Sequence, residues 1–107
     1  MINLEEAKEM CGKGWLELIE KVYQNKPIRI DITDIKEKMG WLRIYFSGNE
    51  GLSFEDWNKF SDLVSNVEDE SMTICEECGE NAEIKETKTK WLKCLCDKCM
   101  EIRNKNY

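Results

Sequence analysis

The fold of this chain is decided by two short stretches, CEECG at residues 75–79 and CDKC at residues 96–99. Each stretch holds two cysteines with two residues between them, and 17 residues separate the two pairs. A C-x2-C pair fits a tight knuckle or the first turn of a helix, and two such pairs can place four sulfur atoms around one metal ion. We therefore predict one structural Zn²⁺ with four ligands: Cys75, Cys78, Cys96 and Cys99.

The metal is predicted to serve the fold and not a reaction. An iron–sulfur cluster also takes four cysteines, but the paired knuckle spacing favours zinc. Four thiolates complete the tetrahedral shell of zinc and leave no position open for water or substrate. We expect the site to be structural and not hydrolytic.

Two further cysteines lie outside these pairs. Cys94 precedes Cys96 by two residues, so on an extended strand both side chains point the same way, and Cys94 could replace one ligand. We prefer Cys96 with Cys99, because C-x2-C is the spacing that a knuckle or helix turn provides, and we expect Cys94 to be a buried thiol beside the site. Cys11 has no partner in sequence and is expected to be a small buried hydrophobe.

The segments around the cysteines complete a finger over residues 71–107. Residues 82–87 and 90–95 are expected to form the two arms of a hairpin, and the run that follows Cys96 has a helical pattern. A knuckle, a hairpin and a helix that carries the second pair of ligands together predict a treble-clef-like C4 zinc finger.

Residues 1–70 are predicted to form an acidic α+β module. A first helix is expected within residues 3–25, where Trp15, Leu18, Ile19 and Val22 recur at helical spacing. Gly12 and Gly14 disfavour helix, so we expect a short helix at 4–10 and a main one at 14–25. Ser53 caps a second helix, in front of an apolar stripe of Trp57, Phe60, Val64 and Val67.

A β-hairpin is expected between these helices, over residues 28–47. Ile28, Ile30 and Ile32 alternate with polar residues, and residues 41–46 alternate again, with Leu42, Ile44 and Phe46 toward the core. Gly40 is the expected turn residue. Residues 34–39 also fit a helical turn, but we favour a strand. The three tryptophans of this module are expected in its core, although one could instead be an exposed anchor for a partner: Trp15, Trp41 and Trp57.

The predicted fold class is therefore α+β, a helix/β-hairpin/helix module followed by the finger. Only four residues, 71–74, join the second helix to Cys75. We expect the module and the finger to pack as one unit.

Composition excludes several functions. The 107 residues carry 22 acids and 16 bases, a net charge of −6, and residues 51–74 alone carry six acids and one base. The chain has no histidine, and no Gly-rich phosphate loop or nucleophilic serine motif is recognisable, so we expect no enzyme. No apolar run is long enough for a membrane span, and the first ten residues lack the pattern of a secretory signal. We expect a cytoplasmic protein.

One basic patch stands out against this acidity. Four lysines and an aromatic residue of the finger hairpin are candidates for nucleic-acid contact: Lys85, Lys88, Lys90, Trp91 and Lys93. The alternative is a charge-balanced hairpin, because Glu83 and Glu86 interleave with the lysines.

Two resemblances add to these inferences. The stretches CEECG and CDKC resemble the finger of the DnaK-suppressor/TraR family of RNA-polymerase-binding regulators, over about 30 residues. That family places a coiled-coil hairpin before its finger, whereas residues 1–70 hold no pair of long helices.

Most of the chain also resembles a group of small phage and prophage proteins. The matching motifs are Gly14-Trp15, the run IKEKMGWLRIY at 35–45, and the finger with Cys75, Cys78, Trp91 and the LCDKC run at 95–99. The resemblance implies a viral or mobile-element origin and a location in the host cytoplasm.

Three functions are compatible with these observations. The leading hypothesis is a non-enzymatic interaction protein that binds and modulates a host protein, for example by inhibiting host defence. An alternative is a nucleic-acid or RNA-polymerase-associated regulator that uses the finger hairpin. A third is a protein that sequesters a nucleotide signal, in a pocket built from Arg29, Trp41 and Arg43.

Overall fold

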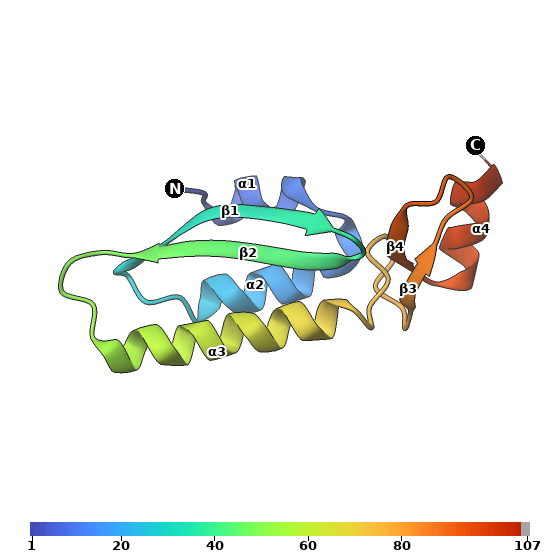
Figure 1. Cartoon of the computed structure of the whole chain (residues 1–107). Coiled ribbons are helices and arrows are strands. Elements are labelled where there is room, and N and C mark those ends of the chain that lie inside the picture. Colours follow the sequence, from blue (N-terminus) through green and yellow to red (C-terminus); the bar gives the residue numbers. More distant parts are fainter. Residues whose placement is uncertain (106–107) are drawn as a thin grey trace.

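The computed structural model describes residues 1–105, and Asn106 and Tyr107, the last two residues of the predicted finger, lie outside the described residues. The described part is elongated, with extents of 51 × 22 × 20 Å (Figure 1). Its elements, in chain order, are α1 (Leu4–Met10), the 3₁₀ turn η1 (Lys13–Trp15), α2 (Leu16–Gln24), β1 (Ile30–Lys38), β2 (Trp41–Gly48), α3 (Phe54–Ser71), β3 (Glu83–Glu86), β4 (Leu92–Leu95) and α4 (Asp97–Lys105). This order of helices and hairpins confirms the predicted α+β class.

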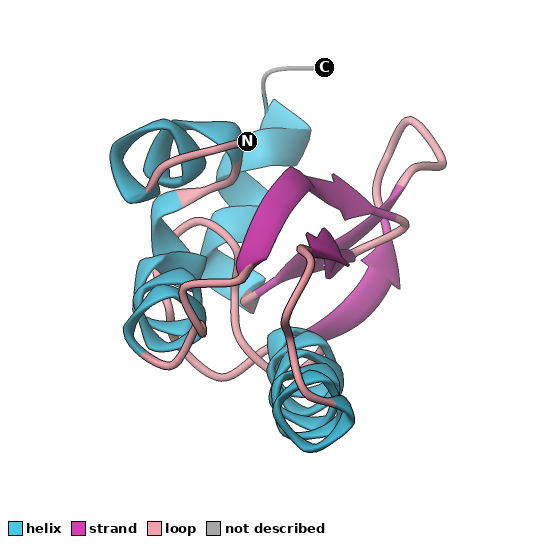
Figure 2. Ribbon diagram, turned by 90° about the vertical axis from the view of Figure 1, so that its left-hand side faces the viewer, coloured by secondary structure: helices cyan, strands magenta, loops and turns pink. Residues whose placement is uncertain are grey.

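The strands form two antiparallel hairpins, β1–β2 and β3–β4. The helices α1, α2 and α3 gather on one side of the β1–β2 hairpin (Figure 2). The core lies between these layers, and its fully buried side chains come from each of them: Trp15, Ile19, Val22, Ile30, Ile32, Ile35, Leu42, Phe60 and Val67. Among residues 1–105, none of the helices combines the length and the apolar character that a membrane span needs.

Residues 34–38, part of the stretch that also fitted a helical turn, belong to strand β1. A β-bulge explains why the apolar residues there have a helix-like spacing. Ile32 pairs with Phe46, but the next paired residue on β1 is Asp34, so Thr33 is an extra residue. Because of this insertion, Ile32 and Ile35 both face the core although they are three residues apart. A plain alternation would have placed them on opposite faces.

The turn of this hairpin depends on two left-handed residues. Met39 has φ 56° and Gly40 has φ 91°, the combination that a two-residue hairpin turn requires. A side chain at Gly40 would also lie 3.0 Å from the side chain of Ile84, because the turn packs on the finger hairpin. The predicted turn residue therefore also positions the finger.

Two expectations about this hairpin are wrong. Ile28 is 91% exposed, because the N–H of Ile30 closes a turn onto the carbonyl oxygen of Pro27 and β1 begins only at Ile30. Trp41 is not a core residue: it alternates with the buried Leu42 and lies on the outer side of the strand. The other two tryptophans do face the core. Trp15 is fully buried, and Trp57 packs its ring 4.9 Å from that of Phe46.

Candidate metal centre

The first cysteine pair lies in a turn that follows α3. The N–H of Gly79 donates to the carbonyl oxygen of Cys75 at 2.9 Å, and the N–H of Cys75 donates to that of Glu80 at 2.7 Å. Gly79 has φ 85°, a left-handed conformation that favours glycine. These bonds close the chain into the predicted knuckle, with Cys75 buried and Cys78 exposed.

The second pair lies where β4 passes into α4. Cys96 follows the last strand residue, and Cys99 lies in the first turn of the helix. The N–H of Cys99 points at the sulfur of Cys96, at 3.4 Å, and the N–H of Met100 donates to the carbonyl oxygen of Cys96 at 2.8 Å. The helix turn thus directs both sulfur atoms to one side, as the C-x2-C spacing predicts.

The structure brings the four predicted ligands together. Their sulfur atoms all lie within 4.8 Å of one another, and those of Cys78 and Cys96 are 3.6 Å apart. A tetrahedral site with Zn–S bonds of ~2.3 Å requires sulfur–sulfur separations of about 3.8 Å. The same separations are far too long for a disulfide, which needs about 2.05 Å. Within residues 1–105 this is the only cluster of cysteine and carboxylate groups with metal-binding geometry.

The electrostatics of the cluster also fit a cation. Burial raises the pKa of Cys75, but backbone N–H groups, first that of Cys96, outweigh burial and lower it to about 7. The pKa of Cys99 is raised well above its usual range, first by burial and then by its neighbouring thiols. Four sulfur atoms this close cannot all carry negative charge unless a positive ion compensates them. The donor set therefore fits a metal ion that binds thiolates.

The two remaining cysteines lie outside the cluster. Cys94 is fully buried and its thiol donates to the carbonyl oxygens of Met72 and Ile74, at 3.3 and 3.2 Å. Burial, followed by the charge of Glu76, raises its pKa to about 11. Cys11 is partly buried, and burial is again the main cause of its raised pKa of about 11. Neither thiol is poised to become a thiolate.

Two glycines form a seat for the knuckle that the sequence analysis missed. The N–H of Gly14 donates to the carbonyl oxygen of Glu76 at 2.9 Å. A Cβ atom at Gly14 would lie 1.9 Å from the carbonyl oxygen of Cys75, and one at Gly12 would lie 2.0 Å from that of Glu76. The indole of Trp15 completes the seat by donating to the carbonyl oxygen of Ile74 at 2.9 Å. The signal in the sequence was the Gly-x-Gly-Trp run, in which we related the two glycines only to a break in the helix and to a family resemblance.

A buried ion-pair network joins the finger to the β1–β2 hairpin. The ammonium group of Lys93 contacts the carboxylates of Glu37 and Glu76, the latter at 3.4 Å. All three side chains are at least three-quarters buried, and one carboxylate oxygen of Glu76 has no hydrogen-bond partner among the described residues. Burial lowers the pKa of Lys93, but the two carboxylates outweigh it and the pKa is raised. This lysine is part of the interior.

The predicted basic patch is therefore divided. Lys93 is turned inward, and Lys85 pairs with Asp97 at 2.8 Å. Lys88, Lys90 and Trp91 lie at the turn of the finger hairpin, with Trp91 68% exposed. Three of the five expected nucleic-acid contacts thus stay together on the surface, and two do not join them.

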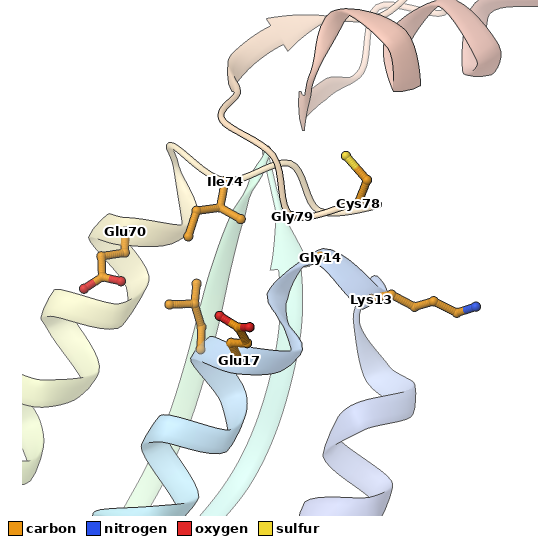
Figure 3. Close-up of a pocket in the computed structure, with 8 residues that line it drawn as sticks. Lys13, Gly14, Glu17, Glu70, Ile74, Cys78 and Gly79 are labelled. Carbon is orange, nitrogen blue, oxygen red and sulfur yellow. The ribbon is translucent and has the colours of Figure 1, made fainter.

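A cavity of about 290 Å³ lies between the knuckle, η1 and the end of α3 (Figure 3). Glu17 and Glu70 line it, and Glu70 also pairs with Lys21 at 3.6 Å. Lys13 extends away from both carboxylates, and the sulfur of Cys78 belongs to the metal cluster, 3.6 Å from that of Cys96. The cavity lacks the converging polar groups that fix a specific ligand.

The residues expected for a nucleotide pocket are far apart. Arg29 precedes β1 and donates to the carbonyl oxygen of Glu50 at 2.7 Å, at the open end of the hairpin. Trp41 and Arg43 lie near the turn at the other end, where Lys38 pairs with Trp41. Arg29 is therefore separated from Trp41 and Arg43 by the length of the hairpin.

Comparison with protein-family models, with curated proteins and with solved structures found no significant match.

Proposed function

We propose that this chain is a non-enzymatic binding protein whose C-terminal finger is held by one structural Zn²⁺ ion. The observation that carries the proposal is the convergence of the sulfur atoms of Cys75, Cys78, Cys96 and Cys99 within 4.8 Å of one another. Zinc is the metal that such paired knuckles favour, and four thiolates give it a closed tetrahedral shell. When bound, the ion supplies no chemistry beyond holding these four residues and the segments that carry them.

The surroundings of the cluster support a structural role. The knuckle backbone is bonded to Gly14 and Trp15, and Glu76, next to Cys75, belongs to the network with Lys93 and Glu37. An ion at this position stabilises the contact between the finger and the helical layer. Metal binding of this kind contributes roughly 10–16 kcal/mol of apparent free energy, as much as the whole stability of a typical domain.

A closed metal site offers no position for a substrate, and the sequence has no histidine to act as a general base. Both features favour a protein that acts through its binding surfaces. We infer that the protein acts by binding a host macromolecule, in keeping with its resemblance to small phage and prophage proteins. The nucleotide-trapping alternative is less favoured, because its three expected residues are separated along the hairpin.

Elemental analysis of the purified, reduced protein tests the proposal. We expect one zinc per chain, retained through gel filtration. If the protein instead contains iron and shows visible charge-transfer absorption, the site is an iron–sulfur site and not a zinc site. A protein with no bound metal after zinc reconstitution would remove the basis of the proposal.

A further inference from the structure

The β1–β2 hairpin carries a row of cations and aromatic rings on the side away from the helices, where Lys36, Lys38 and Tyr45 are exposed and Trp41 and Arg43 are partly buried. The row consists of three cross-strand pairs, in which Asp34 lies opposite Tyr45, Lys36 opposite Arg43, and Lys38 opposite Trp41. Their neighbours on β2, Leu42 and Ile44, are buried, so the alternation of the strand turns this set outward. We name it the hairpin outer face: Asp34, Lys36, Lys38, Trp41, Arg43 and Tyr45.

The rings and cations of this face are stacked on one another. The guanidinium carbon of Arg43 lies 4.6 Å from the ring centre of Trp41 and 6.0 Å from that of Tyr45. The ammonium group of Lys36 lies 5.2 Å from the ring of Tyr45 on the other strand. Such contacts orient long side chains that would otherwise be mobile. The face is thus ordered in advance of any partner.

The positive charge of this face is not neutralised. Among residues 1–105, neither Arg43 nor Lys38 has a carboxylate partner, and Lys36 has only Asp34, at 3.7 Å. Three cations therefore face one acid, in a chain whose net charge is −6. A guanidinium that stacks through its flat face still has its N–H donors available in the plane of the group, where they can bind a phosphate with two hydrogen bonds.

This combination matches one class of partner. Exposed sheets that bind single-stranded nucleic acid stack unpaired bases on aromatic side chains and neutralise phosphates with nearby cations. A duplex has no unstacked bases to offer to such a face, and lysines such as Lys36 and Lys38 are depleted at interfaces between proteins. The finger hairpin is the weaker alternative, because Lys85 and Lys93 are already bound to carboxylates.

We propose that the hairpin outer face binds single-stranded nucleic acid, with Trp41 and Tyr45 stacking bases and with Lys36, Lys38 and Arg43 contacting phosphates. The inference rests on the proposed function as a non-enzymatic binding protein and names its partner.

Fluorescence anisotropy of the zinc-loaded full chain with a labelled oligonucleotide of about 12 nucleotides tests this directly, since single-strand sites span ~4–16 nucleotides. We expect binding at low salt, with a slope of log affinity against log salt near −2, because each of three phosphate contacts contributes about −0.7. Arg43→Ala should reduce that slope by about 0.7. Lys59→Ala removes the same charge from α3, where Lys59 is exposed, and should change neither affinity nor slope.

The stacking part is tested separately. Tyr45→Leu keeps an apolar strand residue but removes the ring, and should weaken binding roughly 5- to 150-fold, whereas Tyr45→Phe should bind like the unchanged protein. The proposal is overturned if zinc-loaded protein does not bind at low salt, if a duplex of the same sequence competes equally well, or if Trp91→Ala abolishes binding while Tyr45→Leu does not. Zinc content is measured on every preparation. A chain with one zinc that fails to bind overturns this inference and leaves the metal site intact.

Discussion

The backbone N–H of Gly14 donates to the carbonyl oxygen of Glu76 across 2.9 Å, and this bond joins the break between α1 and α2 to the cysteine knuckle. The indole of Trp15, one residue on, bonds the carbonyl oxygen of Ile74 on the approach to the knuckle. A segment near the start of the chain therefore supports a metal centre some 60 residues later. Stability of the finger should depend on residues that never touch the metal.

Substitution of Gly14 tests this seat. Alanine there would place its Cβ 1.9 Å from the carbonyl oxygen of Cys75 and 2.8 Å from the carbonyl carbon of Glu76, so backbone has to move. We expect Gly14→Ala to lower the free energy of unfolding by about 2–3 kcal/mol, measured by urea denaturation of the zinc-loaded protein.

The matched control is Gly48→Ala, whose Cβ would meet the flexible end of Leu52 at 2.8 Å and the ring of Trp57 at 3.3 Å. Both contacts are with side chains and not with backbone, so the loss should be smaller, about 1 kcal/mol. Equal losses for the two variants would show that Gly14 is not a critical contact of the knuckle.

Lys93 provides a second test of the contact between finger and module. Lys93→Met keeps the apolar stem but leaves the carboxylates of Glu37 and Glu76 buried without their shared cation. We expect a loss of about 2–4 kcal/mol in the free energy of unfolding, because removing one partner of a buried ion pair leaves the other charge uncompensated.

Lys85→Met is the control for charge, since Lys85 pairs with the exposed Asp97 and surface pairs contribute little. The double variant Lys93→Met with Glu37→Gln should recover part of the lost free energy of unfolding, because it removes one of the two carboxylate charges that Lys93→Met leaves unpaired. Additive losses in this double-mutant cycle would refute a direct interaction.

Cysteine substitutions distinguish the metal ligands from the cysteines that do not bind the metal. Cys75→Ser and Cys99→Ser should each abolish stoichiometric zinc binding, because a serine hydroxyl is a poor replacement for a thiolate. Cys94→Ser should retain one zinc per chain and lose only modest stability, because the thiol of Cys94 bonds the carbonyl oxygens of Met72 and Ile74. Loss of zinc from Cys94→Ser would show that the ligand set is wrong.

Metal removal should affect the two parts of the chain unequally. The largest buried side chains, such as Trp15, Phe60 and Ile19, belong to residues 1–71, whereas α4 has no buried residue. On chelation we expect most of the helical signal in the far-ultraviolet circular dichroism to persist, because α2 and α3 stay folded. Amide hydrogen exchange should rise over residues 73–105. Exchange that rises equally over both parts would show that the module cannot fold without the finger.

Local sequence patterns predicted most of the elements because each has a local cause. The side chain of Ser53 accepts from the N–H of Asp56 at 3.1 Å and starts α3 where the capping pattern placed it. The C-x2-C spacing likewise predicted which four sulfur atoms converge, because a knuckle and a helix turn impose that spacing.

One error has a local cause and the others have nonlocal causes. Trp41 is apolar enough for a core, but its local alternation with Leu42 turns it outward beside Arg43. Lys93 reads as a surface charge, but it is drawn inward by Glu37, 56 residues away in sequence. The extra residue Thr33 shifts the pairing register, and no local pattern indicates a bulge of this kind. Contacts between distant segments decide such positions.

The most direct test of the account is native mass spectrometry of the reduced, zinc-loaded chain, with the same chain after exposure to a chelator as reference. We predict a mass increase of one zinc ion and no disulfide, with the metal lost from the Cys75→Ser variant and kept by Cys94→Ser. A chain that takes up no zinc, or that keeps its zinc when Cys75 is replaced, would contradict the four-cysteine metal centre on which the proposed function rests.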